Sequence, residues 1–294
     1  MDHPVFTGSS AAIVTPFAAD GPDLHELRRL LEFQISSGTA AITVCGTTGE
    51  ASAMTRSERL RVVEAAVRFT DGRVPVIAGV GSNDTSRAVG FALDAKSAGA
   101  DALLAVTPYY NKTTQDGLVA YYETLADAAA MPVIAYNVPS RTGMTIRPET
   151  YERISRHPYL AGTKEASGSV RLVGEILHRC RPGFTVWSGS DSDTVAFLAM
   201  GAKGVISVAA NVVPRLMAEM TALARAGDFR AASEIQRRLL PLDEALFSEV
   251  NPIPVKEAVR LLGYGSGLPR PPLVPCPPDI TRRLREELEA LGAF

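Results

Sequence analysis

Eight short apolar segments recur along the 294-residue chain, and they constrain its fold more than any other feature. Each is a nearly continuous hydrophobic run rather than an alternation of apolar and polar residues, which is typical of strands buried on both faces. Segments with helical periodicity lie between them. The predicted strands are 11–17, 41–46, 75–81, 102–108, 132–138, 160–166, 184–190 and 204–210.

The intervening segments carry the signals of amphipathic helices. Leu24, Leu27 and Leu31 fall on a single helical face. A second helix is expected to begin after Thr55, because Glu58 stands three positions further on and completes a capping-box pattern. A weak internal repeat, in which a glycine closes a helix shortly before a strand, occurs in SGTAAITV, AGADALLAV and MGAKGVISV.

Eight strand–helix units with short connections predict an α/β fold, the (β/α)8 or TIM barrel. The alternative is a doubly wound open sheet. Such a sheet usually stops at about five or six strands and favours a glycine-rich phosphate loop after the first strand. The first apolar segment here runs into TPFAADG, so the barrel is preferred.

The chain continues for about 80 residues after the eighth apolar segment, which is more than one helix requires. We expect a (β/α)8 barrel over residues 1–225 and a C-terminal helical extension over residues 226–294, packed on the barrel and not independent of it. A proline-rich connector at 269–278 precedes the final helix. The predicted helices of this region are 215–226, 229–247, 254–262 and 278–291.

Composition excludes several classes of protein. Hydrophobic residues make up 46% of the chain and charged residues 21%, which excludes global disorder. The net charge is -2 with no long run of one sign, so we expect neither a nucleic-acid partner nor an anionic membrane. No apolar run reaches the roughly 18 residues of a membrane span, and the N-terminus lacks a secretory signal. We therefore expect a soluble, cytoplasmic protein.

Metal ligands and disulfides are not indicated either. The three cysteines are widely spaced, and the four histidines form no pattern typical of metal ligands. We expect no metal site.

Only five of the 30 basic residues are lysines, so few side chains could perform amine chemistry. Reacting groups of barrels lie at the carboxyl ends of strands. Lys164, within LAGTKEA, is the lysine that best fits this rule, and burial there would lower its pKa and favour a nucleophilic amine. The alternative is an ion pair with a barrel glutamate such as Glu165. The other lysines are assigned to helical faces, the opposite rim or a loop, with a surface role for Lys256: Lys96, Lys112, Lys203 and Lys256.

Other strand ends are also rich in reactive groups. Thr47 and Thr48 lie in GTTGE, where the flanking glycines permit a tight turn that exposes backbone N–H groups to a carboxylate. Tyr110 and Tyr136 end two further strands, and a phenol can relay protons to a Schiff-base centre. Arg141 follows the second of these, and its guanidinium can hold a second carboxylate with two hydrogen bonds. Packing or an ordinary turn would explain any one of these residues, but not all of them together.

The motifs GTTGE, TPYYN, YNVPSRTG, GTKEASG, GVISV and NPIPVK occur in this order and span almost the whole chain. Together they resemble the dihydrodipicolinate synthase family, within the class I pyruvate aldolase superfamily that includes N-acetylneuraminate lyase. The resemblance implies a lyase that condenses pyruvate with L-aspartate 4-semialdehyde in lysine and diaminopimelate biosynthesis. The family needs no metal or organic cofactor and is commonly a homotetramer, a dimer of dimers.

The resemblance also implies a role for each matching residue. Lys164 would form the Schiff base with pyruvate, and Tyr136 would donate and accept protons. Thr47 and Tyr110 would complete a proton relay, with Tyr110 reaching in from a neighbouring subunit. Arg141 would bind the carboxylate of the semialdehyde. The residues expected around pyruvate are Thr48, the backbone near Ile206, and Gly189.

Two departures from the family pattern stand out. The acidic pair that usually follows the glycine of the seventh strand is Ser190-Asp191 here, and the role of Asp191 is left open. Feedback-inhibited members carry two histidines and a glutamate at the lysine-binding dimer interface. The matching residues are Arg56, Arg59 and Arg87, although Asn83 and Tyr109 are retained. Positive charges should repel a cationic effector, so weak or absent inhibition by lysine is expected.

Three other functions remain as alternatives. The first is another pyruvate-dependent aldolase or dehydratase acting on a sugar acid or hydroxy-oxo acid, which the arginine in YNVPSRTG disfavours. The second is a catalytically silent barrel, which the presence of the complete set of reactive residues argues against. The third is a phosphate-binding isomerase, but the last two strands end in SGSD and SVAANVV without a clear glycine-rich phosphate site.

Overall fold

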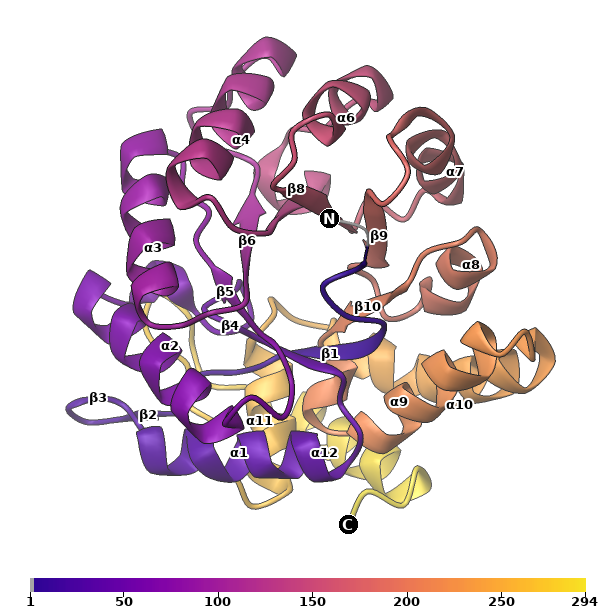
Figure 1. Cartoon of the computed structure of the whole chain (residues 1–294). Helices are drawn as coiled ribbons and strands as arrows, with labels where there is room; N and C mark the ends of the chain where they lie inside the picture. Colours follow the sequence, from indigo (N-terminus) through magenta and orange to yellow (C-terminus); the bar gives the residue numbers. More distant parts are fainter. Residues whose placement is uncertain (1–2) are drawn as a thin grey trace.

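The computed structural model describes residues 3–294, and within them eight parallel strands close into a barrel. The order around the barrel is β1-β10-β9-β8-β7-β6-β5-β4, so each strand pairs with its neighbours in the chain and the last pairs with the first. Figure 1 shows the strands around a central axis with helices outside them. The TIM-barrel prediction is confirmed. The barrel strands are β1 (Gly8–Ala12), β4 (Ala41–Val44), β5 (Val76–Gly79), β6 (Ala102–Val106), β7 (Val133–Asn137), β8 (Leu160–Glu165), β9 (Thr185–Ser188) and β10 (Gly204–Ser207).

The first strand differs from its prediction. β1 covers Gly8–Ala12 instead of residues 11–17, and a short hairpin of β2 (Phe17–Ala18) and β3 (Gly21–Pro22) follows. The strand GSSAA consists of small residues without long apolar side chains. They lie close to residues of the neighbouring strand β4, and the Ser10 hydroxyl is 3.0 Å from the Thr43 hydroxyl. The apolar residues of the predicted run come mostly after the strand has ended.

Helices follow the barrel strands and pack around them. The capping box at the start of α2 is present, since the Thr55 hydroxyl accepts from the Glu58 N–H and the Glu58 carboxylate accepts from the Thr55 N–H. Leu27 and Leu31 of α1 are buried as predicted. The helices up to residue 225 are α1 (Leu24–Ser36), α2 (Arg56–Thr70), α3 (Thr85–Ser97), α4 (Gln115–Ala129), α5 (Pro139–Thr142), α6 (Pro148–Ser155), α7 (Val170–Arg179), α8 (Thr194–Ala199) and α9 (Pro214–Arg225), with 3-10 turns η1 (Ala51–Ala53) and η2 (Ala209–Asn211).

Three further helices complete the chain: α10 (Phe229–Leu246), α11 (Ile253–Leu261) and α12 (Pro278–Ala290). They start and end within one residue of their predicted bounds. α10 packs on α8 and α9, and α12 packs on α10 and α11, which joins this region to the barrel (Figure 1). We propose that residues 226–294 act as an extension that completes one end of the barrel. Among residues 3–294, no helix combines the length and apolar character that crossing a membrane requires.

Candidate active site

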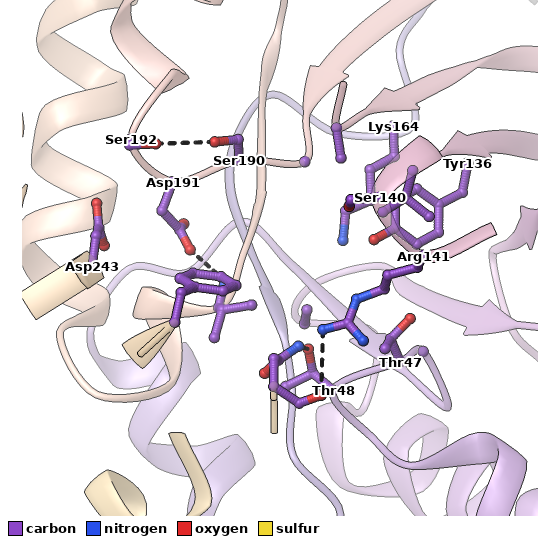
Figure 2. A pocket seen from close by; sticks show the side chains of 18 of the residues that line it. Thr47, Thr48, Tyr136, Ser140, Arg141, Lys164, Ser190, Asp191, Ser192 and Asp243 are labelled. Carbon is purple, nitrogen blue, oxygen red and sulfur yellow. Dashed lines mark hydrogen bonds between the residues drawn. The ribbon is translucent and has the colours of Figure 1, made fainter. Parts of the chain in front are cut away.

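A cavity of about 480 Å³ opens at the carboxyl ends of the strands, where barrel chemistry is expected. Residues that follow β4, β7, β8 and β9 line it, together with residues of α10. Figure 2 shows Lys164, Tyr136 and Arg141 gathered on one side of the cavity, with Thr47 and Thr48 beside them. Six of the predicted site residues line this cavity: Thr47, Thr48, Tyr136, Arg141, Lys164 and Gly189.

Lys164 and Tyr136 occupy paired positions on the adjacent strands β8 and β7. The Lys164 side chain is only 5% exposed, and its Nζ lies 4.5 Å from the centroid of the Tyr136 ring. Burial lowers the pKa of Lys164 to about 8, the nearby Asp191 carboxylate opposes this shift, and the positive charge of Arg141 adds to it. A substantial fraction of this amine is therefore neutral at neutral to mildly basic pH, as nucleophilic attack requires.

Glu165 is engaged elsewhere, so the alternative of an ion pair with Lys164 does not hold. Its carboxylate accepts hydrogen bonds from the Asn137 amide at 2.9 Å and 3.0 Å and from the Tyr151 hydroxyl at 2.8 Å. Successive side chains of a strand point to opposite faces. Lys164 thus reaches the cavity, while Glu165 reaches the helix layer and contacts α6 through Tyr151.

Tyr136 keeps its proton in this setting. The side chain is 8% exposed, and burial raises the pKa of Tyr136 to about 12, although the Arg141 charge and the Thr47 hydroxyl oppose the shift. A neutral phenol next to an amine can donate a proton to a leaving oxygen and recover it later.

Gly189 leaves room for the lysine stem. A Cβ added at this position would lie 3.0 Å from Lys164 Cε and 2.7 Å from Ala166 Cβ, so any side chain would collide with the walls of the cavity. The close approach of the backbone to Lys164 explains why the loop after β9 carries glycine here.

Arg141 is held by a short helix and by the C-terminal region. It lies in α5, its side chain is exposed to the cavity, and its Nη2 donates to the Asn251 carbonyl at 3.4 Å. The Asn251 amide in turn donates to the buried Thr48 hydroxyl at 3.0 Å. Asn251 therefore bridges the GTTGE turn and the arginine loop, a role that the sequence prediction missed although NPIPVK contains this residue.

Two predicted site residues lie apart from the cavity in the described chain, residues 3–294. Tyr110 is 91% exposed, with a backbone φ of 68°, and it does not line the cavity. Ile206 is buried in β10 within an apolar cluster that includes Tyr136 and Trp187. The structure therefore leaves the role of both residues as a prediction.

Lys256 corrects the prediction for the other lysines. Its side chain is 3% exposed, and its Nζ lies 2.6 Å from Glu50 Oε1 and 3.0 Å from the Thr15 carbonyl oxygen. The surface role predicted for Lys256 is wrong, because α11 turns this face onto the GTTGE turn, where Glu50 is the anionic partner of the lysine. Lys96, Lys112 and Lys203 are exposed.

The comparison with known protein families now decides between the alternatives. The model of the Dihydrodipicolinate synthetase family matches residues 5–291, nearly the entire chain. The chain belongs to this family. Within residues 3–294 of this family member, no three His, Cys, Asp or Glu side chains are arranged to hold a metal ion.

Individual relatives agree with the family assignment. The chain is 49% identical over 272 residues to the 4-hydroxy-tetrahydrodipicolinate synthase of a Thermoanaerobacter species, covering 92% of each chain. It is also 49% identical over 271 residues to the enzyme of that name from Geobacter metallireducens, covering 92% of this chain and 93% of the relative.

Solved structures of the family superpose closely on this chain. The dihydrodipicolinate synthase of Thermotoga maritima is 39% identical, with a TM-score of 0.97 over 99% of this chain and 100% of that one. The Aquifex aeolicus enzyme is 44% identical, with a TM-score of 0.96 over 98% and 99% of the two chains. One further neighbour, with a TM-score of 0.97 and 38% identity over 99% and 98%, is described as a monomeric variant.

Proposed function

We propose that the chain catalyses the 4-hydroxy-tetrahydrodipicolinate synthase reaction, the condensation of pyruvate with L-aspartate 4-semialdehyde in lysine and diaminopimelate biosynthesis. The observation that carries this proposal is the buried Lys164 amine, which lines the cavity beside a protonated Tyr136. The activity for which its relatives are named and the intact set of reactive residues support a lyase over a silent barrel.

The first half of the reaction uses the lysine. The neutral Nζ of Lys164 attacks C2 of pyruvate, and Tyr136 donates the proton with which the former carbonyl oxygen leaves as water. The resulting imine is an electron sink, so the methyl group loses a proton and becomes an enamine. Thr48 and the backbone near Ile206 are proposed to hold pyruvate during these steps, with Gly189 close by.

The second half forms the carbon–carbon bond. The enamine carbon attacks the aldehyde carbon of the semialdehyde, and the new alkoxide takes a proton. Arg141 at the cavity edge is proposed to bind the substrate carboxylate, since a guanidinium matches a carboxylate with two parallel hydrogen bonds. Attack of the substrate nitrogen on C2 then closes the ring and releases Lys164.

A proton relay from Tyr136 through Thr47 to Tyr110 is proposed to return protons to solvent. The relay requires Tyr110 of a neighbouring subunit, because each chain holds its own Tyr110 at the surface, 91% exposed. An exposed aromatic ring of this kind supports a subunit contact. We propose a homotetramer, a dimer of dimers, in the cytoplasm.

Borohydride trapping tests the chemistry. Incubation with pyruvate and borohydride should add a pyruvate-derived group to Lys164, mapped by peptide mass spectrometry. An adduct on another lysine, or none, would refute the mechanism.

A comparison of substrates tests which reaction the chain catalyses. Among L-aspartate 4-semialdehyde, sialic acid and 2-keto-3-deoxy sugar acids, the substrate with the highest kcat/KM identifies the reaction. A sugar acid at the top of that series would show that the chain is a different pyruvate aldolase.

Substitution of the arginine tests recognition of the second substrate. Arg141→Ala should raise KM for the semialdehyde at least about tenfold, the loss of a charged hydrogen-bond pair, and leave Lys164 adduct formation with pyruvate largely intact. Arg147→Ala, an exposed arginine at the start of α6, is the matched control and should change neither. Equal loss of both activities in Arg141→Ala would mean that the arginine is structural.

A further inference from the structure

A second cavity, of about 360 Å³, adjoins the first on the side of Thr47, Tyr136 and Arg141. These three residues line both cavities, and Figure 2 shows them together at the edge of the first. From there the second cavity extends to Arg59 of α2 and to Tyr109, which follows β6. The proposed reaction uses neither of these two side chains, so this part of the molecule has no role in it.

Arg59 places a cationic group in the second cavity with few partners. The side chain is 8% exposed, and its Cζ lies 3.6 Å from the centroid of the Phe91 ring. Within residues 3–294 the guanidinium donates one hydrogen bond, from Nη2 to the Gly79 carbonyl oxygen at 2.6 Å. A guanidinium has five N–H donors, so most of them remain available to a ligand. Burial lowers the pKa of Arg59, but a guanidinium keeps its charge in a protein.

The acids around Arg59 do not neutralise this charge. Asp94 of α3 favours the charged form of Arg59, but its two oxygens already accept from Arg56 Nε and Nη2 at 2.6 Å and 2.8 Å. Among residues 3–294, no aspartate or glutamate lines the second cavity, whereas Arg59 and Arg141 both do. A buried charge without a counter-ion costs folding free energy, and arginine is rarely buried unless it is paired. The cavity is therefore suited to an anion.

The walls of the cavity indicate an organic anion. A guanidinium matches the two oxygens of a carboxylate with parallel hydrogen bonds, and the hydroxyls of Ser52 and Tyr109 can donate to the same ligand. Much of the remaining lining is apolar, which suits a short carbon chain better than a fully hydrated inorganic ion. The apolar residues are Ala51, Leu104, Val106 and Val138.

We propose that the second cavity is a binding site for a small organic carboxylate, held by the Arg59 guanidinium. Lys164 does not line this cavity, so binding does not require a Schiff base. Arg141 lines both cavities, and an anion in the second would compete for the charge that is proposed to hold the semialdehyde carboxylate. A bound carboxylate should therefore weaken semialdehyde binding, an effect that rests on the proposed function.

Isothermal titration calorimetry with succinate tests the site on the whole protein. The wild type should bind succinate at least about tenfold more tightly than succinamide, the uncharged analogue of similar shape. Arg59→Gln should raise Kd for succinate at least about tenfold, the loss of charged hydrogen bonds. Arg61→Gln, which removes the same charge from the exposed side of α2, is the matched control and should leave Kd unchanged.

Two further measurements place the bound succinate in the second cavity. Its Kd should be unchanged after pyruvate has been fixed on Lys164 with borohydride, because the adduct fills only the first cavity. At saturating succinate, KM for L-aspartate 4-semialdehyde should rise at least about fivefold in the wild type, a typical coupling between two sites. Succinate should have no such effect on Arg59→Gln.

Each outcome has a separate meaning. An unchanged Kd in Arg59→Gln, or loss of succinate binding in the pyruvate adduct, would overturn the site, and an unchanged KM at saturating succinate would overturn its position beside Arg141. Tighter binding of inorganic phosphate than of succinate would overturn the choice of an organic anion. If Arg59→Gln does not fold, as judged by circular dichroism, the succinamide and adduct comparisons decide the question with the wild type. A missing pyruvate adduct would count against the proposed function, while the succinate titration would still test the cavity.

Discussion

Lys256 and Glu50 form an ion pair that is almost fully buried, with Nζ 2.6 Å from Oε1 and side-chain exposures of 3% and 2%. The second Glu50 oxygen accepts from the Arg270 backbone N–H at 2.8 Å. One carboxylate thus links the GTTGE turn to two parts of the C-terminal region. Glu50 itself has a left-handed backbone, with φ of 55°, which shapes the turn beside Thr47 and Thr48.

Removal of one partner of this pair should destabilise the protein strongly. Lys256→Met leaves Glu50 buried without its counter-ion, so the free energy of unfolding should fall by about 3–5 kcal/mol. Urea denaturation followed by circular dichroism measures the change. Lys203→Met, at an exposed lysine, is the control and should change stability by less than about 0.5 kcal/mol. A loss below about 1 kcal/mol for Lys256→Met would contradict this account.

Schiff-base formation should depend on pH through the lysine itself. Burial lowers the pKa of Lys164 to about 8, so the reactive neutral fraction rises tenfold for each pH unit below that value and levels off above it. The initial rate of borohydride-trapped adduct formation at fixed pyruvate should follow this curve between pH 6 and 9.5. A flat profile, or a midpoint near the ordinary lysine value of about 10.4, would refute it.

The same shift predicts a stability gain when the lysine is removed. The folded-state pKa of about 8 lies below the unfolded value of 10.5, so the unfolded chain binds the proton more tightly. The charged lysine therefore lowers the free energy of unfolding by about 3 kcal/mol below pH 8. This penalty disappears as pH rises to 10.5. Lys164→Met should therefore raise the free energy of unfolding at pH 7 by up to about that amount. The gain should shrink at pH 10, and its absence at pH 7 would show that water or an ion stabilises the charged amine.

Tyr136→Phe should separate proton transfer from folding. The phenol remains protonated over the working range because burial raises the pKa of Tyr136 to about 12. Loss of a positioned proton donor should lower kcat by about 100-fold or more, while the melting temperature changes little. Steady-state kinetics and a thermal melt measure the two effects. Unchanged kcat in the phenylalanine variant would remove Tyr136 from the mechanism.

Feedback inhibition by lysine should be weak or absent. Arg56 forms an ion pair with Asp94, with Nε 2.6 Å from Oδ2. Arg59 is buried against the Phe91 ring and, among residues 3–294, has no carboxylate partner. Arg87 is exposed. A cationic effector would have to approach these uncompensated charges. Activity should remain above about 80% at millimolar L-lysine, a concentration at which even an effector with a Kd in the millimolar range would inhibit. Inhibition at micromolar lysine would contradict the prediction.

Some features of this molecule were accessible from the sequence because they depend on local pattern. The strand-end rule found Lys164, and the capping box at Thr55 needed only Glu58 three positions away. Other features depend on long-range contacts. Nothing near Lys256 indicates its partner, which lies 206 positions earlier in the chain. Asp243 stands within an amphipathic helix, where an acid is ordinarily assigned to the solvated face, and its burial results from packing against the β9 loop.

The bridge from Arg141 through Asn251 to Thr48 has a consequence for synthesis on the ribosome. All eight barrel strands have been translated by residue 207, yet several residues that line the cavity, Asp243 and Asn251 among them, come later. At that point the cavity of the nascent chain still lacks one wall. In this architecture the wall of the proposed substrate chamber is therefore completed by residues translated after the barrel strands.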